Sequence, residues 1–273
     1  MNTLLADRPS NCTLEEAYAR CETLARTPYE NFTVGSWFLP RDTRKYFYSV
    51  YAFCRSVDDL GDEYPGDRMQ ALNLWQHEIT RCYDGTPHHP FMVALQDTIR
   101  KFDIPIDPFL KLVQANRMDQ TTSRFATFAD LDYYCQHSAT PVGHLVLYVS
   151  GYRDEHRQTL SDYTCTALQL ANFWQDVSRD FAMGRIYIPL EDMTRFGYTE
   201  DELGRRVVNN AFRALMKFET ERARELFDKG LALVDTLEGQ IKVDVALFSQ
   251  GGMKVLDAIE RQRYDMLSRR PTL

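Results

Sequence analysis

Residues 169–187 read QLANFWQDVSRDFAMGRIY and carry polar residues at helical spacing. The polar residues Asn172, Asp176 and Asp180 recur every four positions, and apolar residues such as Val177 fill positions between them. In an α-helix, residues four apart share one face, with their Cβ atoms about 5–6 Å apart. The stretch therefore predicts a helix that presents an amide and two carboxylates in a row and packs its other faces.

A second acidic stretch, residues 51–63, reads YAFCRSVDDLGDE. Asp58 and Asp62 have the same spacing, so we expect them to share a helical face. Like charges at this spacing repel by a few tenths of a kcal/mol, and a hard cation such as Mg²⁺ would offset that repulsion. A solvated acidic face is the alternative interpretation for either pair. A third pair, Asp103 and Asp107, has a proline between its members and is not expected to share a face.

Arginines accompany both acidic stretches. Arg55 precedes the first pair, and Arg179 and Arg185 surround the second. Carboxylates can hold a metal ion, and a guanidinium can grip phosphate through two hydrogen bonds. This combination is suited to the ionisation of a diphosphate ester.

Helical periodicity runs through the rest of the chain, and strand-like alternation is nearly absent. A capping box, Thr13-Leu-Glu-Glu16, predicts the start of the first helix. We expect an all-α protein of about ten helices, forming a single domain over residues 1–273 with residues 1–12 disordered. The predicted helices cover residues 13–26, 41–63, 68–83, 90–102, 107–121, 130–150 with a kink at Pro141, 155–181, 207–237 and 243–268. Residues 184–197 are predicted to be irregular, and Gly251-Gly252 to mark either a break or close packing.

Composition excludes several classes of protein. The net charge of −7 argues against nucleic acid as a partner. No stretch approaches the roughly 20 apolar residues of a membrane span, and the first ten residues do not resemble a secretion signal. The six cysteines form no C-x-x-C pair, so we expect reduced thiols. These features predict a cytoplasmic protein, peripheral at most to the inner face of the membrane.

The two acidic stretches resemble the paired aspartate motifs of the squalene/phytoene synthase family, and the resemblance extends from about Tyr29 to Tyr264. Its most specific part is residues 172–187, where N-x-x-x-D-x-x-x-D is followed by GRIY. The resemblance implies the fold of a class I isoprenoid synthase, a helical bundle around a central cavity.

Three shorter signatures resemble one subgroup, the hydroxysqualene synthases of bacterial squalene and hopanoid pathways. They are YENFTVGS at 29–36, SATPVG at 138–143 and ANFWQD at 171–176. Condensing members of the family usually have a serine-rich segment where Glu30 and Asn31 stand here. They also tend to have arginine where this chain has Gln175. The resemblance therefore implies one diphosphate substrate, presqualene diphosphate, which is converted to hydroxysqualene.

The resemblance also implies roles for individual residues. More than one Mg²⁺ would be held by Asp58, Asp62, Asn172, Asp176 and Asp180. The departing diphosphate would be held by Arg55, Arg185 and Tyr187, with Tyr187 counted among the catalytic residues. Further substrate contacts would come from Phe32, Tyr51, Val142, Gly143, Gln169, Gln175 and Tyr264. For Gln169 and Asn172 the alternative is an ordinary buried amide, and Tyr187 could serve only to pack the loop.

Two alternatives to this function remain open. The first is head-to-head condensation of two farnesyl diphosphates to squalene, dehydrosqualene or presqualene diphosphate, a farnesyltransferase reaction. A reducing squalene synthase would need NADPH, which is not expected here. The second is a non-catalytic assembly factor, which loss of the acidic motifs would indicate, but both motifs are intact. Partners predicted besides a prenyl diphosphate are a membrane surface, in transient contact for product release, and other squalene-pathway enzymes.

Overall fold

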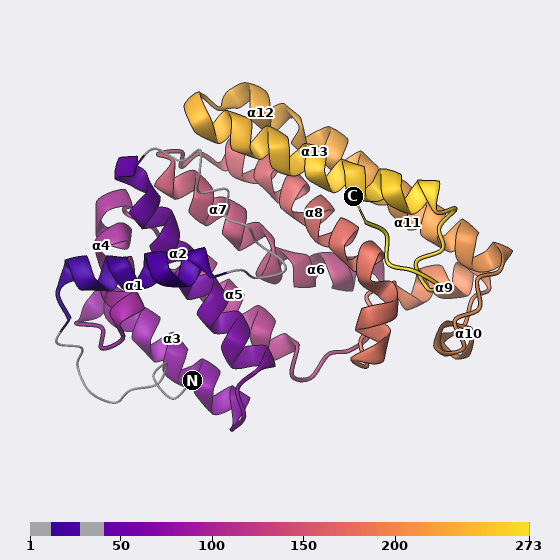
Figure 1. The fold of residues 1–273 in the computed structure, drawn as a ribbon, viewed down its shortest axis with the longest axis horizontal. Helices are drawn as coiled ribbons and strands as arrows, with labels where there is room; N and C mark the ends of the chain where they lie inside the picture. Colours follow the sequence, from indigo (N-terminus) through magenta and orange to yellow (C-terminus); the bar gives the residue numbers. More distant parts are fainter. Residues whose placement is uncertain (1–11, 28–40, 273) are drawn as a thin grey trace. The chain divides into compact units, whose positions relative to one another are not determined.

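A computed structural model describes residues 12–27 and 41–272, and thirteen α-helices lie within them (Figure 1). Within these residues there is no strand, and the one β-type contact is an isolated bridge between Arg124 and Ile186. The prediction of an all-α fold is confirmed. Phe32 and the YENFTVGS signature lie outside the described residues, as do residues 1–11 of the segment predicted to be disordered.

The chain divides into two compact units. The first extends to Gln120 and takes in residues 141–155 as well. Its helices are α1 (Leu14–Arg26), α2 (Arg41–Asp62), α3 (Arg68–Asp84), α4 (Pro90–Phe102), α5 (Asp107–Met118) and α7 (Thr140–Val149). Helix α2 packs against α1, α3, α4 and α5.

Aromatic side chains form the centre of the first unit. The ring of Phe53 on α2 stacks on Trp75 at 6.1 Å and meets Phe109 edge-on at 5.0 Å. All three side chains are almost fully buried. Aromatic rings of this size contribute most of the apolar area that a core buries. Their packing therefore holds α2 in its place against α3 and α5.

The second unit holds residues 121–140 and 156–273. Its helices are α6 (Phe128–Ser138), α8 (Glu155–Ala182), α9 (Leu190–Phe196), α10 (Glu200–Gly204), α11 (Asn210–Gly230), α12 (Ala232–Thr236) and α13 (Gly239–Arg261). Helix α11 packs against α9, α12 and α13. On α8, Trp174 is fully buried and its Nε1 donates to the carbonyl of Glu219 on α11 at 3.2 Å.

Capping residues and prolines in the sequence predicted the bounds of several helices correctly. The capping box at Thr13 is present with both of its hydrogen bonds, and α4 covers the predicted residues. Asp103 and Asp107 belong to different elements, because Asp103 ends α4 in the left-handed conformation. The final helix continues through Gly251-Gly252 without a break.

The prediction of one kinked helix over 130–150 was wrong. Ala139 leaves the helical conformation, with φ −120°, and separates α6 from α7. Pro141 has no N–H to continue the hydrogen-bond ladder of α6, so two helices form.

Other helix boundaries also differ from the sequence predictions. The predicted helix 207–237 starts at Asn210, where the Asn209 side chain caps it, and Leu231 divides it into α11 and α12. The segment 184–197 contains α9, and α10 was not predicted. The last helix ends at Arg261 because Arg263 and Tyr264 adopt positive φ.

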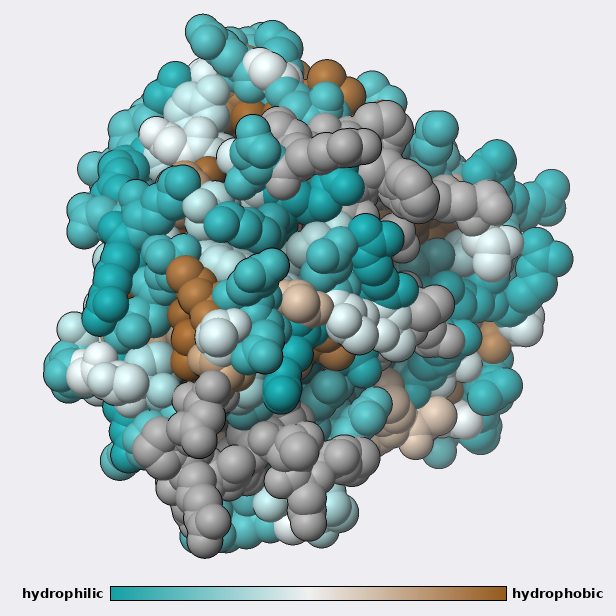
Figure 2. All heavy atoms as spheres, turned by 60° about the vertical axis from the view of Figure 1, so that its left-hand side comes forward, coloured by the Kyte–Doolittle hydropathy of each residue, from teal (hydrophilic) through white to brown (hydrophobic). Residues whose placement is uncertain are grey.

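Hydrophilic residues predominate on the face shown in Figure 2, and the hydrophobic residues there form small separate patches. Among the described helices, none combines the length and the apolar character needed to cross a bilayer.

Candidate functional site

Each acidic segment lies at the C-terminal end of a helix. Asp58 and Asp62 occupy the last turns of α2 in the first unit, and Asp176 and Asp180 the last turns of α8 in the second. The helix macrodipole has its negative end there, so carboxylates at these positions are unfavourable unless a cation compensates them. The placement therefore favours binding of a positive charge at the C-terminal end of α2 and at that of α8.

In the first unit, Asp58 is exposed, and one of its carboxylate oxygens contacts Asn116 on α5. Desolvation by the surrounding chain raises the pKa of Asp58 to about 7, and the charges of Asp62, Asp119 and Asp59 raise it further. A hydrogen bond from Asn116 on α5 opposes the shift, with Nδ2 donating to Asp58 Oδ1 at 3.2 Å. Because solvent reaches this residue, water screens part of the effect.

Arg55 pairs with Asp59, the residue that follows Asp58. Its Nε donates to Asp59 Oδ1 at 2.7 Å, and both side chains are largely covered. Tyr51 lies one turn earlier, where burial raises the pKa of its hydroxyl while Arg55 lowers it. Tyr51, Arg55 and Asp59 thus form a row along α2 beside the Asp58–Asp62 face.

The remaining predicted residue positions of the first unit lie on α7. Val142 is half-buried and packs against the hydrophobic core of this unit, and Gly143 is half-buried beside it.

In the second unit, Gln169, Asn172, Asp176 and Asp180 all lie on α8 and are half-buried. Burial raises the pKa of Asp180 to about 7, and the nearby charge of Asp176 adds to the shift. The guanidinium groups of Arg185, Arg179 and Arg270 lower it again. This end of α8 therefore already attracts cationic side chains.

Arg270, in the segment after α13, pairs with Asp176 through two hydrogen bonds. Its Nε donates to Oδ1 at 2.5 Å and its Nη2 to Oδ2 at 2.9 Å. The same Nη2 donates to Gln175 Oε1 at 3.1 Å, and Gln175 Nε2 donates to the Pro271 carbonyl at 2.7 Å. The predicted substrate residue Gln175 thus holds the C-terminal segment against α8.

Gly184 reverses the chain after α8 and brings Arg185 back beside Asp180. Its φ of +83° is costly for residues with a Cβ. The Arg185 N–H donates to the Asp180 carbonyl at 2.8 Å, which closes the turn. Arg124 secures this turn from outside, since its Nη1 donates to the Gly184 carbonyl at 2.6 Å.

Tyr187 is buried in an aromatic cluster directly after this turn. Its ring is parallel to that of Phe173 at a centroid distance of 3.8 Å, and it also stacks on Phe125 at 5.7 Å. Together with Asp180 and Arg185 it lines a small cavity in the second unit. The packing role considered for Tyr187 is therefore present, and the cavity links it to the carboxylate.

Tyr264 lies elsewhere in the second unit. It lines a pocket of about 490 Å³, and none of the other predicted site residues contributes to that pocket. Its neighbours there are Arg213, Lys217, Thr220, Glu221, Arg224, Glu260 and Arg263.

The donor set fits Mg²⁺. The described residues contain no cluster of three or more His, Cys, Asp or Glu side chains that could enclose an ion. Mg²⁺ usually binds through one or two carboxylates and completes its shell with water and substrate phosphate. Pairs of carboxylates at helix C-terminal ends, with a raised pKa at Asp58 in one pair and at Asp180 in the other, match that requirement.

Four contacts at these segments were not predicted from the sequence: those of Asp59, Asn116, Gln120 and Arg270. Only Gly61 gave a signal, because a glycine inside a helix often marks a close approach of another element. No pattern near Arg270 indicated its contact with α8.

Known proteins resemble this chain over nearly its whole length. The model of the squalene/phytoene synthase family matches residues 25–273. The 15-cis-phytoene synthase of Synechococcus elongatus is 30% identical over 99% of this chain and 93% of its own, and that of Synechocystis sp. is 33% identical over 94% and 80%.

Two solved structures have the same fold. The squalene synthase HpnC from Alicyclobacillus acidocaldarius superposes with a TM-score of 0.90 at 46% identity, covering 92% of this chain and 96% of its own. A dehydrosqualene synthase superposes with a TM-score of 0.84 at 26% identity, covering 93% and 89%. The family model covers most of the chain, and relatives of 30% identity or more match nearly all of it. The chain therefore belongs to the squalene/phytoene synthase family.

Proposed function

We propose that this isoprenoid synthase converts presqualene diphosphate and water to hydroxysqualene and diphosphate. The observation that carries the proposal is Gln175, a neutral residue directly before the second acidic pair, whose amide holds the C-terminal segment. Condensing relatives tend to have an arginine at this position for their diphosphates. An enzyme that acts on presqualene diphosphate, a single substrate with one diphosphate group, needs only one diphosphate-binding site. The higher identity to HpnC than to the phytoene synthases supports a C30 product.

In the proposed reaction the bond between the substrate carbon and the diphosphate oxygen breaks, and its electron pair leaves with the diphosphate. The resulting cyclopropylcarbinyl cation rearranges, a water oxygen bonds to carbon, and that oxygen loses a proton. No electron is gained from outside, so NADPH is not required.

Both acidic segments are proposed to act on the same diphosphate. Asp58 and Asp62 of α2, and Asp176 and Asp180 of α8 with Asn172, would hold Mg²⁺, which supplies positive charge to the departing group. Arg185 lies beside Asp180, so it can donate to phosphate oxygens there, and Arg55 can do the same beside Asp59. The aromatic cluster around Tyr187 keeps water away from one side of Asp180.

A specific observation favours a second candidate, the condensation of two farnesyl diphosphates. Arg270 places a guanidinium on Gln175 and Asp176, so the charge absent from position 175 is supplied from the C-terminal segment. The name of the similar HpnC structure, a squalene synthase, is consistent with this alternative.

Product analysis separates the two candidates. Purified enzyme with Mg²⁺ receives either presqualene diphosphate or farnesyl diphosphate, each with and without NADPH, and the hydrocarbon extract is analysed by mass spectrometry. The proposal predicts hydroxysqualene from presqualene diphosphate, no effect of NADPH and no consumption of farnesyl diphosphate. Consumption of farnesyl diphosphate would establish the condensing alternative. Contact with a membrane surface and with other pathway enzymes stays a prediction.

A further inference from the structure

Helix α5 approaches α2 closely at the first acidic segment, and Asn116 makes the contact. The residue is 6% exposed. Its Nδ2 donates to Asp58 Oδ1 and to the Leu112 carbonyl, both at 3.2 Å. Because both acceptors are oxygens, the amide can satisfy them only with its nitrogen on this side. The orientation of the Asn116 side chain is therefore determined, and it faces Asp58 as a donor.

Gly61 makes room for this amide. A Cβ at position 61 would collide with Asn116 Oδ1 and lie 3.0 Å from its Cγ. Glycine weakens the interior of a helix, and here it stands between Asp58 and Asp62. The missing side chain lets α5 reach the acidic segment.

A second amide one turn further on strengthens the same contact. Gln120 Nε2 donates to the Gly61 carbonyl at 3.0 Å and to the Asn116 carbonyl at 2.9 Å. The Gln120 amide thus bridges the α2 backbone and the Asn116 backbone, so Asn116 cannot move away from Asp58 without breaking these bonds.

We propose that Asn116 is a positioning residue that holds one carboxylate oxygen of Asp58 and so presents this carboxylate to a divalent cation in a fixed orientation. The inference rests on the proposed function in one respect, namely that Asp58 binds the cation. Loss of a group that orients a metal ligand from behind typically weakens metal binding by about 10–100-fold. Such a group acts through Asp58, without touching the substrate.

The direct test is Asn116→Leu, which keeps the branched shape of the side chain and removes both donors. The readout is Mn²⁺ binding in the presence of inorganic diphosphate, followed through the electron paramagnetic resonance signal of free Mn²⁺. We expect the variant to bind Mn²⁺ about tenfold more weakly than the wild type. In an Asp58→Asn background the same substitution should have little further effect, because the two groups act as one unit.

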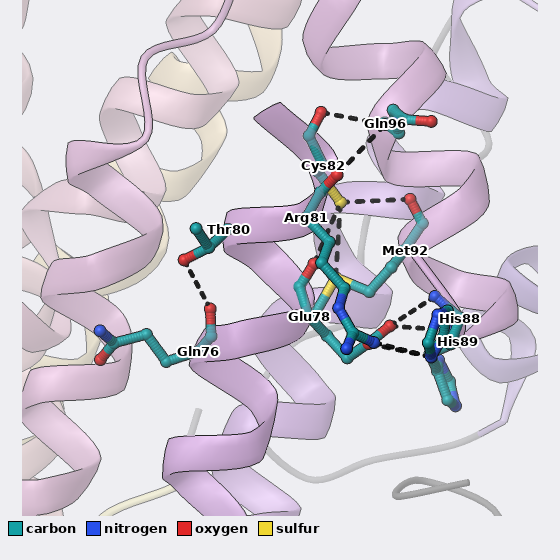
Figure 3. A network of polar contacts seen from close by, with 9 residues as sticks. All are labelled: Gln76, Glu78, Thr80, Arg81, Cys82, His88, His89, Met92 and Gln96. Carbon is teal, nitrogen blue, oxygen red and sulfur yellow. Dashed lines mark hydrogen bonds and ion pairs between the residues drawn. The ribbon is translucent and has the colours of Figure 1, made fainter. Parts of the chain in front are cut away.

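A matched control is available in the same unit. Gln96 Nε2 donates to the carbonyls of Arg81, Cys82 and Gly85 at 3.4, 3.1 and 3.0 Å, in a polar network between α3 and α4 (Figure 3). Gln96→Met also removes a half-buried amide with several acceptors. It should lower thermal stability and leave Mn²⁺ affinity unchanged.

The outcomes are distinct. If Asn116→Leu binds Mn²⁺ as tightly as the wild type, Asn116 only packs, and the proposal is overturned. It is overturned as well if the wild type binds no Mn²⁺ with diphosphate. Should Asn116→Leu fail to fold, as judged by circular dichroism, Asn116→Ala takes its place in the same comparison. If Mn²⁺ binding responds as expected but presqualene diphosphate is not converted, the proposed function fails and the positioning role stands.

Discussion

A single absent Cβ, at Gly61, decides how closely α5 can approach Asp58. Gly61→Ala improves the intrinsic helix propensity of α2 by about 0.5–1 kcal/mol, but the new methyl group collides with Asn116. Overpacking costs about 1–3 kcal/mol. We therefore predict a net loss of stability, measured as a lower midpoint of thermal unfolding.

Gly251→Ala is the control for this substitution. Gly251 lies inside α13, and a methyl group added there would meet no heavy atom of a neighbouring element within 4 Å. At this position the helix propensity acts alone, and we expect the variant to be more stable by about 0.5–1 kcal/mol. A gain of stability at both positions would contradict the close contact at Gly61.

Arg270 offers a second test at the level of single residues. Its guanidinium compensates Asp176 at the negative end of α8 in the absence of a metal ion. Arg270→Gln removes a paired charge that is partly exposed, so we expect a loss of about 1 kcal/mol. The midpoint of thermal unfolding in EDTA should fall by roughly 2–4 °C.

Addition of Mg²⁺ and diphosphate should raise the midpoint of this variant at least as much as that of the wild type, because the ions no longer compete with Arg270. Differential scanning fluorimetry with and without EDTA measures both effects. An unchanged midpoint in EDTA would show that the pair with Asp176 contributes nothing to stability.

The two carboxylate pairs could be predicted because their members are four residues apart and depend only on helical geometry. Asn116 and Arg270 could not. Their contacts with the acidic residues span 58 and 94 positions of sequence, so only the packing of whole helices creates them. Whether the predicted ligands bind magnesium stays a prediction until binding is measured.

At the level of elements, helices with strong local signals were predicted well. Thr13 and Glu16 satisfy each other's backbone groups, and Pro90 suits the first turn of a helix, so α1 and α4 begin where expected. The interruptions at Ala139 and Leu231 were missed. Apolar periodicity continues across both positions. Such periodicity predicts which face of a helix is buried, but it does not predict a break of one residue.

The contact of α9 with α11 contains a buried acid that makes stability depend on pH. Glu219 is fully buried, and it shares Arg222 with Asp192, at 2.9 and 2.8 Å. Burial raises the pKa of Glu219 to about 8, with Arg222 opposing and Asp192 adding to the shift. The folded state therefore binds more protons than the unfolded state between about pH 4.5 and pH 8.

With this sign, the contribution of Glu219 to stability is complete below about pH 4.5 and is lost as the pH rises through 8. Glu219→Gln keeps the shape and removes the titration. We predict that the free energy of unfolding of the wild type, relative to this variant, decreases from pH 5 to pH 8 in urea titrations. A difference that does not change with pH would mean that Glu219 is charged in the folded protein throughout.

For the whole molecule, the decisive question is whether both acidic segments serve one reaction. Family membership makes the chain an isoprenoid synthase, while each segment belongs to its own compact unit. If both bind the same metal–diphosphate complex, Asp58→Asn/Asp62→Asn and Asp176→Asn/Asp180→Asn should each lower turnover by at least about a thousandfold. Both variants should remain folded, because removing like charges from a helix C-terminus relieves repulsion, and loss of the Asp176–Arg270 pair costs only about 1 kcal/mol.

The same two variants distinguish a shared complex from separate roles without any substrate. A ligand present at a hundred times its dissociation constant stabilises the folded state by about 2.7 kcal/mol, which raises the midpoint of thermal unfolding by roughly 5–10 °C at this chain length. We expect the wild type to show this rise with Mg²⁺ and inorganic diphosphate, and each double variant to lose it entirely. If one variant keeps the full rise, the carboxylates that it lacks do not hold the metal–diphosphate complex, and the acidic segments act independently.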